Sequence, residues 1–258
     1  MTPEPLDALA IRRQLSPATA AALNPIHIFQ ALDSTNRWLL EQGKGGDVCL
    51  AETQTAGRGR YGKSWQSPAG NIYCSVRWHF EVIPPHFGCL SLVVGVALAR
   101  ALEQAGLQGH GLKWPNDLWH QDRKLGGILI QTAEVLSQVV IGFGLNVNID
   151  PQNGDPIDQP WCQLSDLLVS LPDRNHLLGL VLEQLIPALQ RFPAFSMPDF
   201  LPEWERRDVL SGRHIRVLSG HKTLTGVAMG LDDRGCLRLR DPSGCEHAFS
   251  SADVSIKL

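Results

Sequence analysis

The chain lacks a strong excess of charge of either sign, since its 258 residues carry a formal net charge of −3 at pH 7. A broad basic surface that would attract nucleic acid is therefore not expected. Cysteine is sparse and scattered, and no Cys-x-x-Cys pair suggests a zinc site or a dithiol redox site. Free thiols in a reducing compartment are the simplest account of the six cysteines, so we expect a cytoplasmic protein.

The sequence also lacks signals for a membrane. It has no basic-then-apolar leader at its start and no run of about 18 apolar residues that would predict a membrane span. With 43% hydrophobic and 19% charged residues, the composition is ordinary for a globular protein. The chain is long enough for one large domain, or for a large domain and a small one.

A glycine-rich segment is the most informative feature that is present. Residues 57–63 read Gly-Arg-Gly-Arg-Tyr-Gly-Lys. Glycine lets the backbone approach a ligand closely, and arginine offers a planar pair of donors to a carboxylate or phosphate. The segment predicts a loop that closes on a small anion, with a flexible, solvated basic turn as the alternative. Its spacing matches neither the phosphate-binding loop Gly-x-x-x-x-Gly-Lys-Ser/Thr nor a dinucleotide-binding fingerprint.

A second segment, residues 113–130, places a turn and a lysine ahead of a buried strand. Pro115 disfavours helix at the preceding residue, and Asn116 and Asp117 favour a turn. Lys124 then leads into an apolar strand with two glycines, against which a ligand could lie. The lysine would supply a mobile positive charge to that ligand. A hairpin with a surface lysine is the alternative.

The periodicity of apolar residues predicts a helix-rich region followed by an all-β tail. Helices are predicted over 6–15, 35–41, 86–105, 175–192 and 199–206, and strands over 48–51, 71–80, 111–114, 126–132 and 138–147. Shorter strands are predicted over 214–218, 222–229, 236–240 and 246–249. We therefore expect two domains, residues 1–207 and 208–258. Residues 150–161 are predicted to be a loop that becomes ordered over a ligand.

Five segments, in this order, resemble the signature segments of biotin protein ligases. They are 33–36 (Asp-Ser-Thr-Asn), 57–60 (Gly-Arg-Gly-Arg), 113–117 (Lys-Trp-Pro-Asn-Asp), 123–127 (Arg-Lys-Leu-Gly-Gly) and 142–148 (Gly-Phe-Gly-Leu-Asn-Val-Asn). The resemblance implies an α+β fold with a central mixed β-sheet and packed helices, like that of class II synthetases and biotin/lipoate ligases. It also implies a small C-terminal SH3-like β-barrel. Residues 1–24 leave no room for the DNA-binding domain of some relatives, so the short, ligase-only class is expected.

The resemblance implies an ATP-dependent ligase that activates biotin as biotinyl-5'-AMP. Biotin would then pass to a lysine of a biotin carboxyl carrier domain of a carboxylase, and Mg²⁺ would screen the departing pyrophosphate. Positive charge is needed because the biotin carboxylate and the ATP α-phosphate repel each other. No nucleic acid, no membrane and no metal site built by the protein are expected, and the family allows a homodimer.

By matched position, the resemblance also assigns roles to individual residues. The catalytic set would be Lys124, Arg58, Arg60 and Asp117. The biotin-binding set would be Ser34, Thr35, Asn36, Gln54, Gly57, Arg58, Gly59, Arg60, Lys124 and Gly127. The ATP-binding set would be Arg58, Arg60, Trp65, Lys113, Asn116, Lys124, Asn146 and Trp161. Simpler structural roles stay open for three of them, since Ser34 could be a helix cap, Trp65 a core residue and Asn146 a turn former.

Other functions stay open at this stage. A lipoate–protein ligase would share the two-step chemistry but would not need small polar side chains for a ureido ring. A non-catalytic biotin-binding sensor and an inactive homologue are further alternatives. Tyr61 and Lys63 stand where some relatives carry arginine, which leaves the affinity for nucleotide open.

Overall fold

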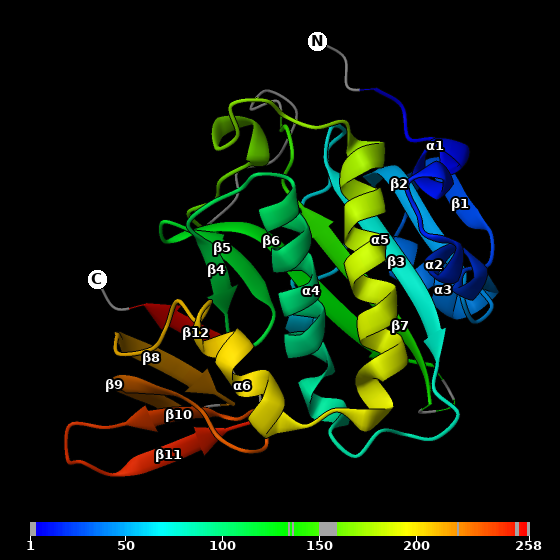
Figure 1. The fold of residues 1–258 in the computed structure, drawn as a ribbon. Helices are drawn as coiled ribbons and strands as arrows, with labels where there is room; N and C mark the ends of the chain where they lie inside the picture. The colour runs from blue at the N-terminus through cyan, green and yellow to red at the C-terminus, as the bar shows by residue number, and fades with distance from the viewer. Residues whose placement is uncertain are drawn as a thin grey trace.

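A seven-stranded mixed sheet with helices on both faces forms the larger part of the molecule, and a five-stranded antiparallel sheet follows it (Figure 1). The computed structural model describes residues 4–133, 135, 137–149, 159–220, 222–250 and 253–256. Residues 150–158 of the expected loop lie outside the described residues. The predicted α+β architecture, with a separate small β unit at the C-terminal end, is confirmed.

The large sheet has the strand order β1-β2-β3-β7-β6-β5-β4. Its strands are β1 (Ile26–Leu32), β2 (Val48–Gln54), β3 (Ile72–His79), β4 (His110–Lys113), β5 (Asp117–His120), β6 (Arg123–Thr132) and β7 (Gln138–Leu145). Only the pair β1 and β2 is parallel, and the other neighbours in this sheet are antiparallel. The central strands β3, β7 and β6 therefore hold the sheet together through long antiparallel ladders.

Helices cover both faces of the large sheet. The helices of the described residues are α1 (Ala8–Arg13), α2 (Pro17–Ala22), α3 (Thr35–Gln42), α4 (Leu90–Gln104), α5 (Arg174–Arg191) and α6 (Met197–Glu205), with short 3₁₀ turns at Arg60–Gly62, Phe87–Cys89, Leu164–Asp166 and Phe192–Ala194. Helix α6 lies beside the small sheet (Figure 1). In Figure 1, α4 and α5 lie side by side across one face. On the other face α3 packs through Leu39 on Cys49 and Val140. Burial of apolar side chains on both faces is what a central sheet of this kind requires.

The small sheet has the order β11-β10-β9-β8-β12. Its strands are β8 (His214–Ser219), β9 (Lys222–Leu231), β10 (Leu237–Arg240), β11 (Glu246–Phe249) and β12 (Asp253–Ile256). Buried residues of this sheet, such as Ile215 and Leu239, belong to the same contiguous apolar cluster as α4 and α5. The boundary between residues 207 and 208 stays a prediction.

Three strands, β1, β5 and β12, were not predicted from the sequence, and Asp117 begins β5 instead of occupying a turn. The error at β5 has a physical cause. The connection from β5 to β6 is made by Gln121 and Asp122, both with positive φ (47° and 60°). Such tight hairpin turns usually carry glycine or asparagine, so the sequence contains no strong turn signal here.

The stretch Phe87–Gln104 is long and apolar enough to cross a membrane by length and composition, which corrects the expectation that no such run exists. It comprises a 3₁₀ turn and α4. In this structure 67% of the stretch is buried inside the protein, as in a helix of a protein core. It is therefore weak evidence for a membrane span.

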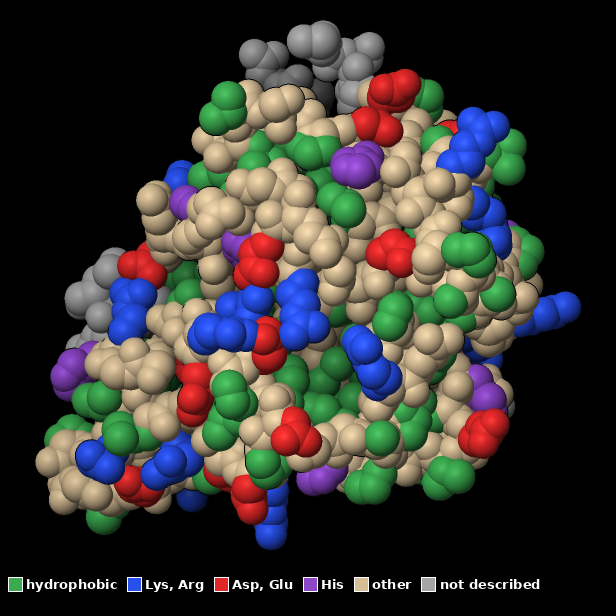
Figure 2. All heavy atoms as spheres, viewed as in Figure 1, with side chains coloured by type: hydrophobic (Ala, Val, Ile, Leu, Met, Phe, Trp, Pro, Cys, Tyr) green, Lys and Arg blue, Asp and Glu red, His purple; other side chains and the backbone are tan. Residues whose placement is uncertain are grey.

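The exposed surface on the side of α4 and α5 mixes charges of both signs (Figure 2). A set of ion pairs joins α4 to the end of α6. Arg207 lies 2.8 Å from a carboxylate oxygen of Glu103 and 2.8 Å from one of Glu203, and Arg100 lies 3.1 Å from Glu203. These ion pairs connect the large sheet's helix to the segment that leads into the small sheet.

A buried ion pair joins the start of α5 to β2. Arg174 Nη1 lies 2.7 Å from Glu52 Oε2, and the two side chains are only 5% and 12% exposed. Arg174 Nη2 donates to the carbonyl of Glu4, and Glu52 Oε1 accepts from the backbone N–H of Leu6. The pair therefore holds the N-terminal segment, α5 and the central sheet at one point.

We expect Arg174→Ala to lower the free energy of unfolding by about 3–5 kcal/mol, because Glu52 would keep a buried charge without a partner. Urea denaturation followed by circular dichroism measures this change. Arg238→Ala is the control, since Arg238 pairs with Glu246 at the exposed surface. A loss from Arg174→Ala no larger than that of the control would contradict a structural role for the buried pair.

Candidate functional site

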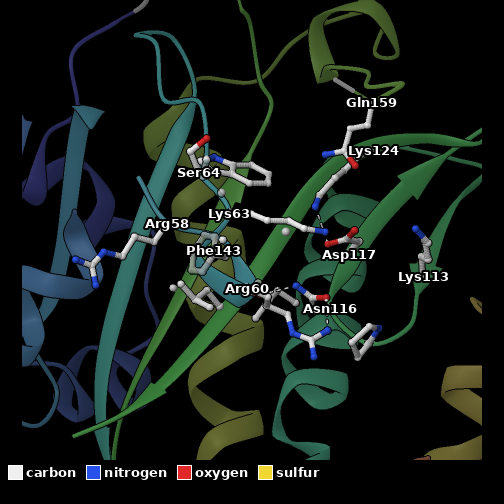
Figure 3. Close-up of a pocket in the computed structure, with 18 of the residues that line it drawn as sticks. Arg58, Arg60, Lys63, Ser64, Lys113, Asn116, Asp117, Lys124, Phe143 and Gln159 are labelled. Carbon is white, nitrogen blue, oxygen red and sulfur yellow. Dashed lines mark hydrogen bonds and ion pairs between the residues drawn. The ribbon is translucent and has the colours of Figure 1, made fainter. Parts of the chain in front are cut away.

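A cavity of about 540 Å³ lies where the glycine-rich loop meets the large sheet (Figure 3). Its walls come from the start of α3, the loop 57–65, the end of β4, the start of β5, the facing parts of β6 and β7, and the small sheet. The predicted site residues in its lining are Ser34, Thr35, Asn36, Gln54, Arg58, Gly59, Arg60, Trp65, Lys113, Asn116, Asp117, Lys124 and Gly127. Segments far apart in the sequence are thus brought to one place.

One end of the cavity is lined by neutral polar groups. Ser34 caps α3, because its Oγ accepts a hydrogen bond from the N–H of Arg37. The structural role that the sequence left open for Ser34, that of a helix cap, is therefore confirmed. The N–H of Thr35 donates to Gln54 Oε1 at 2.9 Å, and Gln54 Nε2 donates to Ser67 Oγ at 2.9 Å. These bonds fix the side chains at this end without any charged group.

Gly57 does not line the cavity, but its lack of a side chain permits this arrangement. A Cβ atom at Gly57 would lie 2.4 Å from the carbonyl oxygen of Trp65 and 2.6 Å from Ser67 Oγ. Both distances are far below van der Waals contact. Gly57 therefore allows the two sides of the loop to approach each other.

The loop is a folded hairpin. The N–H of Gly59 donates to the carbonyl of Lys63 at 2.7 Å, and the N–H of Trp65 donates to the carbonyl of Gly57 at 2.9 Å. Tyr61 at the tip has a φ of 56°, which is uncommon for a residue other than glycine. These backbone hydrogen bonds give the loop a defined hairpin conformation.

The two arginines of the loop point in different directions. The guanidinium of Arg60 donates to Asn116 Oδ1 at 3.3 Å and to the hydroxyl of Tyr61 at 3.0 Å. It also lies over the Tyr61 ring, 4.8 Å from the centroid. Arg58 is exposed, and in Figure 3 it points away from the other labelled cations. Arg60 is thus the arginine that ties the loop to the β4–β5 connection.

The other end of the cavity is rich in positive charge. Lys124 Nζ lies 2.9 Å from Asp117 Oδ1, and both side chains are 14% exposed. Figure 3 shows Lys63 and Lys124 both reaching toward Asp117. Lys113 lies nearby, with its Nζ 4.3 Å from the centroid of the Trp119 ring. Asp117 offsets part of this charge, and an anionic ligand would compete with it for Lys124.

The indole of Trp65 lies on two glycines of the sheet. Gly127 of β6 and Gly144 of β7 are cross-strand partners. A Cβ at Gly144 would lie 2.7 Å from Trp65 Cε2, and a Cβ at Gly127 would lie 3.1 Å from Trp65 Cζ3. The sequence predicted that a ligand could lie against this glycine-containing strand. The Trp65 ring contacts the strand here and Gly127 also lines the cavity, so that role stays a prediction. Lys124 Nζ is 5.1 Å from the same ring.

Asn146 and Trp161 do not line the cavity. Asn146 Nδ2 donates to the carbonyls of Lys124 and Cys162, at 3.3 Å and 3.1 Å. Trp161 forms an isolated bridge with Lys124, whose N–H donates to the carbonyl of Pro160 at 2.9 Å. In this structure both residues therefore lie beside the Lys124 backbone. Their roles toward ATP stay predictions.

Several lining residues were not expected from the sequence. They are Lys63, Ser64, Tyr73, Trp114, Pro115, Ile128, Leu129, Gly142, Phe143, Gly144, Gln159, Arg216, Leu218, Thr223 and Val254. Gly142 and Gly144 lie within a recognised segment and could have been found there. The last four belong to the small sheet, and no local pattern in an all-β tail indicates that it faces a distant cavity.

Comparisons with known proteins agree with this geometry. Residues 28–146 match the Biotin/lipoate A/B protein ligase family, and residues 210–257 match the Biotin protein ligase C terminal domain. The bifunctional ligase/repressor BirA of Escherichia coli is 34% identical over 99% of this chain and 80% of its own length. The biotin--[acetyl-CoA-carboxylase] ligase of Mycobacterium tuberculosis is 34% identical over 97% of this chain and 95% of its own length.

A solved structure shows the same fold. The biotin protein ligase of Aquifex aeolicus in complex with biotin and ATP is 27% identical, with a TM-score of 0.79 over 91% of this chain and 100% of that one. Five ordered segments meet at one cavity, and full-length relatives match nearly the whole chain. This chain therefore belongs to the family of biotin protein ligases.

Proposed function

We propose that this chain uses ATP to convert biotin to biotinyl-5'-AMP and then transfers biotin to a lysine of a biotin carboxyl carrier domain. The observation that carries the proposal is that the side chains along strand β6 are neutral and polar near one end and positively charged near the other. Near one end, the carbonyl of Leu129 accepts from Asn36 Nδ2 at 3.2 Å. Lys124, near the start of the strand, lies five residues earlier (129 − 124), which is about 16 Å along a strand.

This elongated cavity suits a molecule with a neutral polar ring at one end and a carboxylate at the other. The neutral end offers donors and acceptors to a ureido ring. The cationic end, with Lys124, Arg60 and Lys113, would hold the carboxylate beside the ATP α-phosphate. A carboxylate oxygen attacks the α-phosphorus and pyrophosphate leaves. Later a neutral lysine amine attacks the acyl carbon of the mixed anhydride, AMP leaves, and the nitrogen gives up one proton as the amide forms. The fixed positive charges would stabilise the first transition state.

Magnesium is proposed to enter with ATP. No group of three or more His, Cys, Asp or Glu side chains among the described residues could hold a metal ion. Asp117 is the acidic residue in the described lining of the cavity. Mg²⁺ commonly binds through one or two carboxylates together with substrate phosphates, and Asp117 fits such an arrangement. When bound there, the ion would screen the charge of the departing pyrophosphate.

The direct test combines the purified chain with ATP, biotin and a biotin carboxyl carrier domain. Formation of a biotinyl-lysine amide, with release of AMP and pyrophosphate, is the expected result, and mass spectrometry of the carrier detects it. A reaction that attaches lipoate in place of biotin, or that attaches neither, would contradict the proposal.

We predict that Lys124→Ala slows adenylate formation by about 100- to 1000-fold, because a charge aimed at the transition state is lost. Biotin affinity should fall much less than the rate of adenylate formation, since the neutral end of the cavity is untouched and only one partner of the carboxylate is lost. Single-turnover formation of biotinyl-AMP and calorimetric biotin binding measure the two effects. Lys44→Ala, which alters an exposed lysine, is the control. Equal losses in both measurements would mean that Lys124 only binds substrate.

We predict that Arg60→Ala releases reactive adenylate from the site. Arg60 ties the loop to Asn116, and a closed loop protects a mixed anhydride from water. Biotinylation of a bystander protein, followed by streptavidin blotting without any carrier domain, should therefore increase. Arg13→Ala on α1 serves as the control. Bystander labelling at the wild-type level would show that Arg60 does not keep the loop closed.

We predict that Gly144→Ala opens the loop, because the new methyl group would overlap the Trp65 ring. Trypsin should then cut faster after Arg58, Arg60 or Lys63, and the KM for ATP should rise by about tenfold. Limited proteolysis with mass spectrometry and steady-state kinetics measure these changes. Gly88→Ala is a matched control, since nothing lies within 4 Å of a Cβ there. Similar cleavage rates for the two variants would contradict the role assigned to Gly144.

A further inference from the structure

Ser75 on β3 lies behind the neutral end of the cavity and does not belong to its lining. Its side chain is fully buried, with 0% exposure. Ser75 Oγ lies 2.7 Å from Thr35 Oγ1 and 2.6 Å from Asn36 Oδ1. Both neighbours belong to the first turn of α3 and line the cavity. One buried hydroxyl therefore contacts two residues that face the space for a ligand.

The orientation of the Asn36 amide is fixed by its other partners. Asn36 Nδ2 lies 3.2 Å from the carbonyl oxygen of Leu129 and 2.9 Å from Gln131 Oε1. A backbone carbonyl can only accept, so the amide nitrogen must face Leu129 and the amide oxygen must face Ser75. Gly142, the cross-strand partner of Ser75, leaves room for this oxygen, since a Cβ there would lie 2.0 Å from it.

Counting the hydroxyl protons then determines to which partner the Thr35 hydroxyl donates its hydrogen bond. Asn36 Oδ1 can only accept, so the single hydroxyl proton of Ser75 is donated to it. The 2.7 Å contact between Ser75 and Thr35 therefore requires that Thr35 donates its proton to Ser75 Oγ. Gln54 Oε1 lies 3.3 Å from the Thr35 hydroxyl and already accepts the Thr35 N–H at 2.9 Å. The Thr35 hydroxyl thus has lone pairs, and no proton, for a ligand.

We propose that Ser75 is a positioning residue that makes Thr35 Oγ1 a fixed hydrogen-bond acceptor, so that the neutral end of the cavity selects a ligand ring that bears an N–H. This inference rests on the proposed function, because the ureido ring of biotin carries two such groups. A dithiolane ring has neither group and would leave Thr35 unpaired. A ring with oxygen in place of the N–H would present a second acceptor to Thr35 and be repelled.

The test measures, by isothermal titration calorimetry, the affinities for biotin and for its two cyclic carbamate analogues, each with one ureido N–H replaced by oxygen. For the wild-type chain we expect one of the analogues to bind about 100-fold more weakly than biotin. In Ser75→Ala the Thr35 hydroxyl no longer has Ser75 as its acceptor, so it can donate its hydrogen bond to the ring oxygen. The ratio of the affinity for biotin to the affinity for this analogue should therefore fall by about tenfold. A ratio measured on one protein sample does not depend on the folded fraction.

Three further variants complete the test. Ser75→Thr keeps the hydroxyl, so its ratio of biotin affinity to analogue affinity should equal that of the wild-type chain. Gly142→Ala, which displaces the Asn36 oxygen, should lower it as Ser75→Ala does. Thr19→Val removes a buried hydroxyl on α2 and should leave it unchanged.

Two outcomes separate this inference from the function on which it rests. Normal biotin binding with an unchanged ratio in Ser75→Ala, or an equal fall in Thr19→Val, would overturn the role of Ser75 alone. Failure of the wild-type chain to bind biotin would overturn the proposed function and this inference together.

Discussion

Close approach to the bare backbone of strand β7 is the constraint on which both ends of the cavity depend. Gly142 and Gly144 are two residues apart, so they face the same side of the sheet. The first leaves room for the Asn36 amide, and the second seats the indole of Trp65. A side chain at either position would push α3 or the glycine-rich loop away from the sheet. The neutral end and the loop end of the cavity are thus supported by one short stretch of strand.

The distribution of charge follows from this support. The neutral end is held by amide and hydroxyl groups that satisfy one another, so no charge is buried there without a partner. The cationic end lies where strands β4, β5 and β6 begin or end, and Asp117 partly neutralises it. The Asp117 carboxylate offsets part of the repulsion between these nearby cations, and a carboxylate and a phosphate could replace it as partners of Lys124.

The scaffold behind the site is held by interactions that involve no ligand. The buried pair of Arg174 and Glu52 joins α5, β2 and the N-terminal segment. On the other side of the molecule, Arg207 links α4 to α6, just before the small sheet. Because the small sheet also contributes Arg216 and Thr223 to the cavity lining, its attachment to the larger part affects the site as well as stability.

Many helices, strands and site residues of this protein could be predicted from local sequence. Apolar periodicity predicted the long helices and the central strands, because burial on a sheet or helix face imposes a regular spacing of apolar residues. The ordered segments indicated the family, and the resemblance assigned roles to Lys124, Asp117 and Arg60 by matched position. The positive charge of Lys124 and Arg60 also suits chemistry that brings two anions together. Strands β1, β5 and β12 were missed, and β5 is short and ends in a turn without glycine.

Only the tertiary structure decided how these residues work together. Trp65 covers the glycines of β6 and β7, Asn146 holds the backbone of Lys124, and Ser75 sets the polarity of Thr35. Each of these roles depends on a contact between residues far apart in the chain, and its effect on a proton or a backbone atom leaves no local pattern. Sequence determined which chemical groups are present, whereas packing determined which atom of each group faces the ligand.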